Sequence, residues 1–327
     1  MSQHAHLTTI LALTAACLSG TAQAASYVLV AETDEGCKLY LDGTDFVQEG
    51  CNVHVRNGDG VTDSTNSLGN LIVGYESHSG TKTGSHNLVV GSDHSYTSYG
   101  GLVAGANNTI SGEYATVTGG YSNEASGIYA TVTAGVHNDA SGPFTAVNGG
   151  GRNTADGAYT AVNGGIHNTA SNSYSSVSGG YWNFATGNYA SVSGGYHNEA
   201  SGTYAAVSGG RENAASAVLS SVLGGAYNEA SGTYTAVSGG RYNDATGNSA
   251  SVSGGQYTAY GDFSSALGGT LNVANGDSAA VTGGFGNDAS GDYAAVLGGA
   301  SNLASGSYAT VAGGNGNTVS AFYGYAP

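Results

Sequence analysis

A 15-residue unit repeats along this chain from Gly119 to Gly314, and this short period constrains the fold more than any single residue does. Two copies read SGTYAAVSGGRENAA and SGSYATVAGGNGNTV. Successive Gly-Gly pairs (Ala-Gly in one copy) recur at this same period, except for one step that is shorter by a single residue. The first residue of each pair stands at positions 119, 134, 149, 164, 179, 194, 209, 224, 239, 254, 268, 283, 298 and 313. Such a period predicts a solenoid, in which each coil contacts only its neighbours and the stack shares one core.

The residues of one coil predict short strands joined by tight turns. In the segment Tyr204–Gly210, Ala205 and Val207 lie two residues apart, so they share one face of a strand. The equivalent positions carry a small residue and then usually Val in other coils, so we expect this face to be buried and Ala206 to face outward. Gly-Gly and Ser-Gly supply the corners because glycine tolerates positive φ. The sequence therefore predicts an all-β fold, a parallel β-roll or β-solenoid of 14–15-residue coils.

An asparagine recurs at one position of nearly every coil. Alternation in the segment after each Gly-Gly pair turns Asn198 and Ala200 to one face and His197 and Glu199 to the other. Stacked coils place such amides about 4.8 Å apart, the spacing of an asparagine ladder in which each side chain bonds the next. A row of ligand-binding amides is the alternative. The short coil at 254–268 can be aligned by omitting this asparagine alone. The predicted structural ladder comprises Asn123, Asn138, Asn153, Asn168, Asn183, Asn198, Asn213, Asn228 and Asn243, with further members at Asn108, Asn272, Asn287, Asn302 and Asn317.

An aromatic residue heads the first predicted strand of most coils. Stacking of the coils would align these rings in an outer column. Such a column either covers the thin core, packs against another subunit or forms a ligand-binding strip, and the sequence leaves these roles open. The candidates for an interface or ligand strip are Tyr114, Tyr129, Tyr159, Tyr174, Tyr189, Tyr204, Tyr234, Tyr293 and Tyr308, with Phe144 and Phe263 in the same row.

Residues 1–24 match a secretory signal peptide. An apolar run from Leu7 to Leu18 precedes Ala22-Gln23-Ala24, which fits an A-x-A cleavage site. Cys17 offers a lipoprotein alternative, although the residues before it lack the usual leucine. We therefore expect an exported protein at the cell surface or outside the cell.

Residues 25–66 are predicted to form a cap before the first coil, with short strands at 26–30, 37–41 and 52–55. Cys37 and Cys51 remain after signal removal, and an even count in an exported chain predicts one disulfide; two free thiols are the alternative. Weaker copies of the repeated strand at 70–74, 87–91 and 101–105 place the start of the solenoid near residue 67. We expect the repeats to span 67–319 and a tail to follow at 320–327.

The charge pattern argues against several functions. Charged residues make up only 9% of the chain, and the net charge is −16 with six Lys and Arg. No basic patch can neutralise phosphates, so we expect no nucleic-acid partner. No stretch after the signal approaches the roughly 18 apolar residues of a membrane-spanning helix. His137, His167 and His197 recur two coils apart, about 9.6 Å, too far to share a metal. We expect no cofactor, no metal site and no enzymatic activity.

The strand pattern Y-A/S-x-V/A-x-G followed by N-x-A-S-G, repeated over 67–319, resembles the YadA-like or hemagglutinin-type head repeats of trimeric autotransporter adhesins. The resemblance implies a left-handed parallel β-roll, a homotrimer and a bacterial surface location, with a head that binds host matrix or cell surfaces. It covers the head alone, because no heptad stalk or membrane-anchor segment follows Gly314 in this sequence. Most coils are also one residue longer than the family's unit and carry a double glycine.

These features favour an adhesin-like repeat protein whose solenoid surface binds glycans, matrix or cell surfaces. The alternative is a structural extracellular or envelope solenoid without a specific ligand. An ice-binding solenoid is a third hypothesis, based on the T-x-T ranks Thr116/Thr118 and Thr131/Thr133, but later coils replace these threonines. Saturable binding to a glycan or matrix array would distinguish the first hypothesis from the second.

Overall fold

A computed structural model describes residues 27–32, 36–76 and 80–327, so the predicted signal peptide at 1–24 lies outside the described residues. The chain divides into two units, the first ending at Val55 and the second running from Arg56 to Pro327. Every regular element of the described residues is a β-strand, and the second unit is a parallel β-solenoid. The predicted fold class is confirmed.

The first unit contains a three-stranded antiparallel sheet in the order β1-β2-β3. Its strands are β1 (Tyr27–Glu32), β2 (Lys38–Asp42) and β3 (Asp45–Glu49). The first two predicted strands are therefore confirmed within a few residues, but the third prediction, at 52–55, is wrong. Gly43, with a φ of 59°, lies in a tight turn between the paired Asp42 and Asp45, so the chain returns at once as a hairpin.

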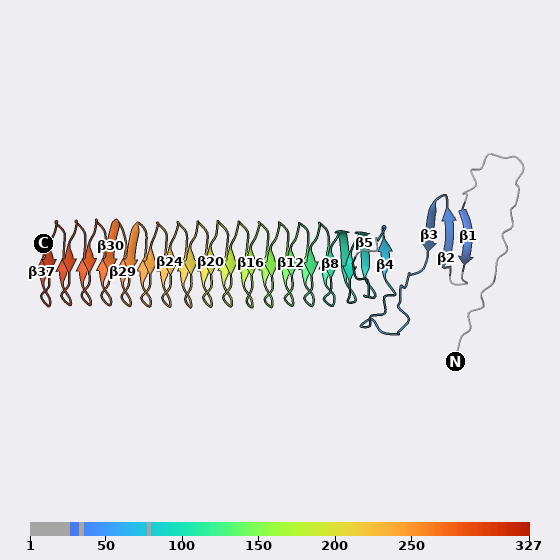
Figure 1. Cartoon of the computed structure of the whole chain (residues 1–327), viewed down its shortest axis with the longest axis horizontal. Coiled ribbons are helices and arrows are strands. Elements are labelled where there is room, and N and C mark those ends of the chain that lie inside the picture. Colours follow the sequence, from blue (N-terminus) through green and yellow to red (C-terminus); the bar gives the residue numbers. More distant parts are fainter. Residues whose placement is uncertain (1–26, 33–35, 77–79) are drawn as a thin grey trace, which may run out of the picture. The chain divides into compact units, whose positions relative to one another are not determined.

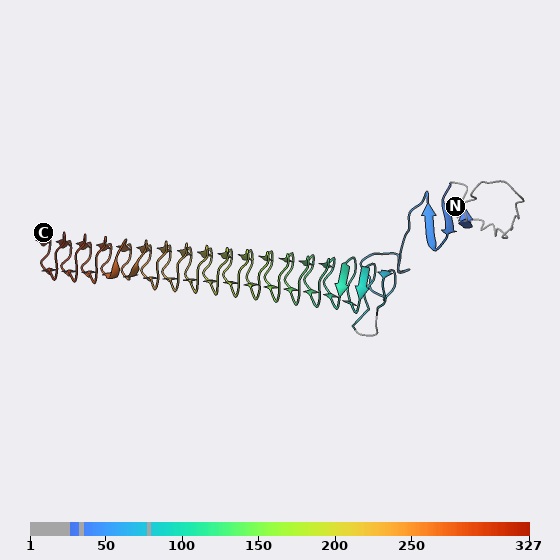
Figure 2. The same cartoon turned by 90° about the horizontal axis from the view of Figure 1, so that it is seen from above.

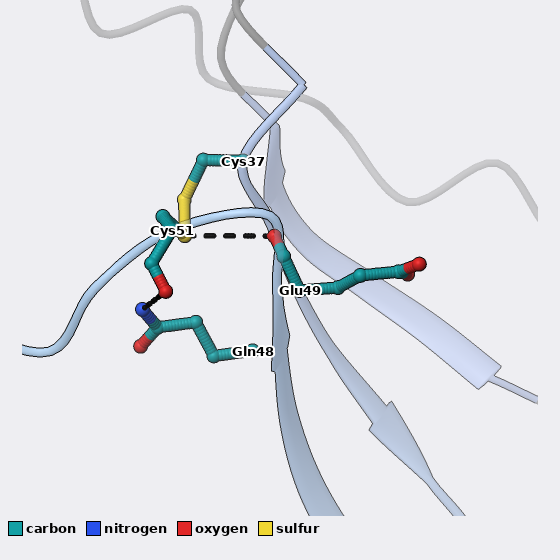
Figure 3. Close-up of a disulfide and its surroundings, with 4 residues drawn as sticks. All are labelled: Cys37, Gln48, Glu49 and Cys51. Carbon is teal, nitrogen blue, oxygen red and sulfur yellow. Dashed lines mark hydrogen bonds between the residues drawn. A yellow bond between two sulfur atoms is a disulfide. The ribbon is translucent and has the colours of Figure 1, made fainter.

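Cys37 and Cys51 form the predicted disulfide just outside the ends of this hairpin (Figure 3). Their Cα atoms lie 5.1 Å apart, in the usual range for a disulfide. The Gln48 side-chain amide donates a hydrogen bond to the Cys51 carbonyl (3.0 Å), which holds the chain where it leaves β3. In the loop-entropy model, closing a loop of this length stabilises the fold by about 3 kcal/mol.

The second unit stacks its coils in one continuous row, from cyan to red in Figures 1 and 2. Each regular coil contributes one strand to each of two parallel sheets, and most of these strands are two residues long. The first sheet, here called the valine sheet, consists of β4 (Leu71–Val73), β5 (Leu88–Ser92), β7 (Leu102–Ala106), β9 (Thr116–Val117), β11 (Thr131–Val132), β13 (Ala146–Val147), β15 (Ala161–Val162), β17 (Ser176–Val177), β19 (Ser191–Val192), β21 (Ala206–Val207), β23 (Ser221–Val222), β25 (Ala236–Val237), β27 (Ser251–Val252), β29 (Ser265–Ala266), β31 (Ala280–Val281), β33 (Ala295–Val296), β35 (Thr310–Val311) and β37 (Tyr325–Ala326).

The second, 16-stranded sheet is here called the alanine sheet. It consists of β6 (Ser95–Tyr96), β8 (Thr109–Ile110), β10 (Glu124–Ala125), β12 (Asp139–Ala140), β14 (Thr154–Ala155), β16 (Thr169–Ala170), β18 (Phe184–Ala185), β20 (Glu199–Ala200), β22 (Ala214–Ala215), β24 (Glu229–Ala230), β26 (Asp244–Ala245), β28 (Gln256–Ala259), β30 (Thr270–Ala274), β32 (Asp288–Ala289), β34 (Leu303–Ala304) and β36 (Thr318–Val319). Except between β28 and β30, each strand pairs in register with its equivalent one coil away, as in Glu199 with Ala214.

The core is a thin layer of small side chains between the two sheets. Val207 and Ala205 are each 1% exposed, and Ala200 and Ala215 from the alanine sheet are fully buried. Ala206 is only partly buried, so the predicted inward and outward faces are confirmed. Because the coil is flat, alanine and valine fill this layer. Among the residues whose burial the structure describes, larger aliphatic or aromatic core residues such as Ile110 and Tyr96 occur only in the first coils.

The two glycines of each pair have different roles. Gly195 adopts a φ of 94°, and a Cβ atom there would overlap the Gly210 carbonyl oxygen of the next coil. A Cβ atom at Gly194 would meet open space, which explains why Ala134 stands at the equivalent position. The second glycine is therefore required by coil stacking, and the first is not.

The short coil contains the main irregularity of the alanine sheet. Gln256 pairs with Thr270 but Tyr257 pairs with Asn272, so β30 bulges at Leu271. The omitted residue is therefore the one before the ladder position, and Tyr257 takes the place of the asparagine. The predicted alignment, which omitted the asparagine itself, is therefore wrong by one residue. After the bulge the strands pair in register from Tyr257 with Asn272 to Ala259 with Ala274.

The chain packs on the solenoid beyond both ends of the predicted repeat region. Asn57 donates its backbone N–H to the His86 ring (3.2 Å) and Asn66 donates to the Ser85 hydroxyl (2.9 Å), so residues after Arg56 lie on the first coil. At the other end, β37 pairs with β35, and the predicted tail at 320–327 completes another partial coil. A cap formed by the disulfide-bonded sheet stays a prediction.

Candidate functional site

The ladder asparagines form one buried row along the solenoid, but they bond differently from the predicted amide-to-amide ladder. The Asn198 side-chain amide donates to the Gly194 carbonyl of its own coil (2.9 Å) and to the Gly210 carbonyl of the next (3.0 Å). Its Oδ1 accepts the backbone N–H of Asn213 (3.0 Å). Direct amide contacts, such as Asn243 to Asn228, occur at a few coils only. Each asparagine fastens the Gly-Gly corner of one coil to the next, so the row serves the structure and its amides are not available to a ligand.

His94 belongs to this row although no repeated motif in the sequence marks it. The side chain is completely buried. Its Nδ1 accepts the backbone N–H of Asn108 (3.2 Å), and its Nε2 lies 3.1 Å from the Val90 carbonyl. Nδ1 takes the place of the asparagine Oδ1, which accepts a backbone N–H of the next coil, and Nε2 takes the place of Nδ2, which donates to a carbonyl of its own coil. The ring therefore carries its proton on Nε2. His94 precedes Asn108 by the length of one short coil, and this spacing is the signal that could have identified it.

The aromatic column lies at the corner formed by Ser-Gly and the next two residues, here called the tyrosine corner. Tyr204 is a turn residue with a φ of 59°, so the expectation that these rings head a strand is wrong. From Tyr114 to Tyr204 the rings stack in order, with centroids 4.8 to 5.2 Å apart and planes within 15°. Each ring in this stretch is 38 to 52% exposed.

The other column candidates lie on the same line in shorter groups. Leu219 and Ser249 occupy the equivalent positions on either side of Tyr234. Tyr293 and Tyr308 stack again at 4.8 Å. Aromatic pairs contribute about 0.5–1.5 kcal/mol beyond their buried area, which offsets the roughly 1–2 kcal/mol cost of a left-handed backbone at a residue with a side chain.

A second exposed row lies at the opposite corner, here called the asparagine corner, in the two residues before each ladder asparagine. The second of the two again has positive φ, as at Trp182 and Glu212. An aromatic row at this corner was not predicted from the sequence. The signal was available, because Tyr181-Trp182, Tyr196-His197 and Arg241-Tyr242 hold the chain's single tryptophan and one of its few arginines.

These side chains contact one another from coil to coil. Tyr181 stacks on Tyr196 with centroids 5.7 Å apart, and both rings are more than 40% exposed. The Arg211 guanidinium lies 5.6 Å from the Tyr196 ring and 5.4 Å from the Tyr227 ring. Arg241 covers Tyr242 at 4.7 Å. The row from Tyr181 to Tyr242 is therefore an ordered aromatic and guanidinium surface.

The three repeated histidines lie in this same row and do not converge. His137 packs edge-on against Tyr121, and His167 packs against Tyr181, with centroids 6.0 Å apart in both cases. Across the described ranges, no three His, Cys, Asp or Glu side chains are grouped to hold a metal ion. Nor does that part of the chain contain a helix long and apolar enough to cross a membrane.

Acidic side chains follow several ladder asparagines on the outer face of the alanine sheet. Burial raises the pKa of Asp139, and the paired Glu124 raises it further. The pKa of Asp244 is raised in the same way, by burial and then by Glu229. Like charges on paired strands repel, so these positions reduce stability at neutral pH.

Comparison with known proteins adds no name to these surfaces. No protein-family model matches the sequence, and no curated protein matches it either.

Proposed function

We propose that this chain is an exported, adhesin-like repeat protein whose solenoid corners bind glycans, matrix or cell surfaces. The observation that supports this most is the exposure of aromatic side chains along both corners, such as Tyr174 at 49% and Trp182 at 42%. Extended exposed apolar surface normally marks an interaction site. The resemblance to the head repeats of trimeric autotransporter adhesins belongs to this proposal and adds a surface location in bacteria.

Export is proposed from the signal-peptide pattern at 1–24 together with the disulfide. Disulfides form and persist in secreted proteins and at cell surfaces, and are rare in the cytosol. Cys37 and Cys51 are joined in the first unit, where the hairpin brings their Cα atoms to 5.1 Å. An oxidising destination fits both features.

The two corners are proposed to have different tasks. The tyrosine corner presents the same flat ring at successive coils from Tyr114 to Tyr204, which suits contact with identical chains. A thin core of alanine and valine also gains from association, since small cores bury little apolar area. The side chains at the asparagine corner differ from coil to coil, so this corner presents a non-repeating surface of the kind that a specific ligand can recognise.

The test uses the full chain purified from an exporting host. Light scattering gives its mass as a multiple of one mature chain, which weighs less than the 32.1 kDa of residues 1–327 once the predicted signal peptide is removed. Arrays of glycans and matrix proteins measure binding. Saturable binding supports the adhesin-like function. Self-assembly without saturable binding would replace it with a structural extracellular solenoid.

A further inference from the structure

A hollow of about 390 Å³ opens on the outer face of the alanine sheet beside the asparagine corner. Its floor is Ala214 in β22, which pairs in register with Glu199 in β20 and Glu229 in β24. Both glutamates are exposed, whereas Ala214 offers only a methyl group. The hollow therefore exists because one small residue stands between two long acidic ones.

The remaining walls are largely aromatic. Phe184 closes one end, and its ring meets His197 edge-on with centroids 6.1 Å apart. Tyr227 and Glu212 form the side toward the corner. Beyond this wall, the stacked rings of Tyr181 and Tyr196 continue the apolar surface along the solenoid.

The charges around the hollow select among ligands. Three glutamates line it, so an anionic sugar or a phosphate would be repelled. Arg211 forms an ion pair with Glu212 (3.1 Å), and Arg211 and Arg241 lie 5.4 and 5.7 Å from the ring of Tyr227, a lining residue. A basic peptide that extended past Tyr227 would therefore meet two guanidinium groups. An uncharged polyol can both donate and accept hydrogen bonds, and it is repelled neither by the glutamates nor by the arginines.

We propose that this hollow, formed by Phe184, His197, Glu199, Ala214, Tyr227 and Glu229, binds an uncharged hexose unit of a glycan. The apolar C–H face of the sugar packs on the exposed His197 ring, the Phe184 ring stands perpendicular beside it, and the sugar hydroxyls donate to the glutamate carboxylates. Neighbouring units of the glycan extend over Tyr196 and Tyr181. The inference rests on the proposed adhesin-like function and assigns it a site and a ligand class.

The decisive variant is Ala214→Phe in the full chain, which fills the hollow without changing its charge. Phe184 already occupies the equivalent position two coils earlier, so the fold accommodates phenylalanine there. Thr154→Phe, at the same position of a distant coil, is the matched control. Neutral gluco-, galacto- and manno-oligosaccharides are screened on an array beside sialylated and sulfated glycans and oligolysine, and the strongest neutral binder is titrated by calorimetry.

We expect wild type and Thr154→Phe to bind a neutral oligosaccharide equally, and Ala214→Phe to bind it at least about tenfold more weakly. Glu199→Gln with Glu229→Gln should weaken binding too, and this pair decides the matter if Ala214→Phe fails to fold. Equal binding by all variants overturns the site while leaving the adhesin-like function standing. Binding of oligolysine or sulfated glycans alone overturns the ligand class. Absence of any binding to the glycan and matrix arrays overturns both the site and the proposed function.

Discussion

The two corners of each coil share a backbone requirement but differ in the side chains that meet it. Tyr204 at the tyrosine corner and Glu212 at the asparagine corner both have positive φ, at 59° and 52°. The tyrosine corner keeps an aromatic ring at this position in most coils. The asparagine corner accepts Ser, His, Arg, Trp, Glu, Tyr, Leu, Asn and Gly. The left-handed backbone therefore does not determine the residue at either corner.

The difference follows from what joins successive coils at each place. At the asparagine corner a buried amide makes three bonds, two to carbonyls and one to a backbone N–H, so the exposed neighbours are free to change. At the tyrosine corner the contact between successive side chains is the stacking of the rings themselves. The asparagine corner, joined by a buried amide, carries a varied surface, whereas the tyrosine corner keeps a stacked ring in most coils. Backbone hydrogen bonds such as Leu219 N–H to the Thr203 carbonyl (2.9 Å) also join the coils there, which explains why Leu219 and Ser249 are tolerated in the row.

The largest effect is expected when the side-chain amide of one ladder asparagine is removed. Asn198→Ala leaves the Asn213 N–H and the Gly194 and Gly210 carbonyls without their side-chain partner in a partly buried place. We expect a loss on the order of 3 kcal/mol in the free energy of unfolding, since each unsatisfied buried group costs about 1–3 kcal/mol. His197→Ala, the exposed neighbour, should change it by less than about 0.5 kcal/mol. Urea denaturation with equal midpoints for the two variants would show that the amide does not hold this corner.

A second test concerns the layer between the corners. Ala205 is 1% exposed, and Ala205→Leu should overpack the core at a cost of about 1–3 kcal/mol. Ala206→Leu places the same side chain on the partly exposed outer face and should be nearly neutral. Thermal unfolding of the two variants measures the difference. A loss at Ala206 as large as that at Ala205 would mean that the outer face is covered by another chain.

The third test compares the corners as interfaces. We expect the mature protein to be a trimer, as the resemblance implies, and changing Tyr174, Tyr189 and Tyr204 together to serine should weaken it. Each of the stacked pairs among these rings lies at 4.8 Å, so the triple change removes the last three rings of the continuous stack. Serine at Tyr181, Tyr196 and Tyr227 of the asparagine corner is the control and should leave the mass unchanged. A wild-type monomer by light scattering at micromolar concentration would eliminate the interface role.

The fold could be predicted from the sequence because the same pattern of small buried residues recurs in coil after coil. Small residues such as Ala205 and Val207 recur two apart in coil after coil, and this alone determines which face is buried. The disulfide followed from the cysteine count. The detail of the corners was beyond this reasoning, because an alternation argument assumes extended strands, whereas Tyr204 lies in a left-handed turn outside the two-residue strand.

The proposed binding hollow could not be predicted from the sequence for a related reason. A repeat pattern identifies the residues that recur in every coil. The hollow over Ala214 is formed by residues that differ from coil to coil, so the pattern does not predict it. Phe184, Glu199, Ala214 and Glu229 occupy one position in successive coils, and only their order creates a cavity. Likewise His94 replaces an asparagine through the placement of its two ring nitrogens, which no composition pattern reveals.

The smallest expected effect concerns the acidic residues beside the asparagine corner. Burial and Glu124 raise the pKa of Asp139, so the folded protein binds this proton more tightly than the unfolded chain does. The stabilisation from the protonated group is complete below the unfolded-state pKa of about 3.9 and is lost as the pH rises through the higher folded-state pKa. Asp139→Asn should therefore raise the melting temperature slightly at pH 7, and this gain should vanish near pH 4. Thr154→Asn, one coil away in register, is the control and should show no such pH dependence. A gain at pH 4 as large as at pH 7 would show that the amide stabilises by hydrogen bonding and not by removing charge.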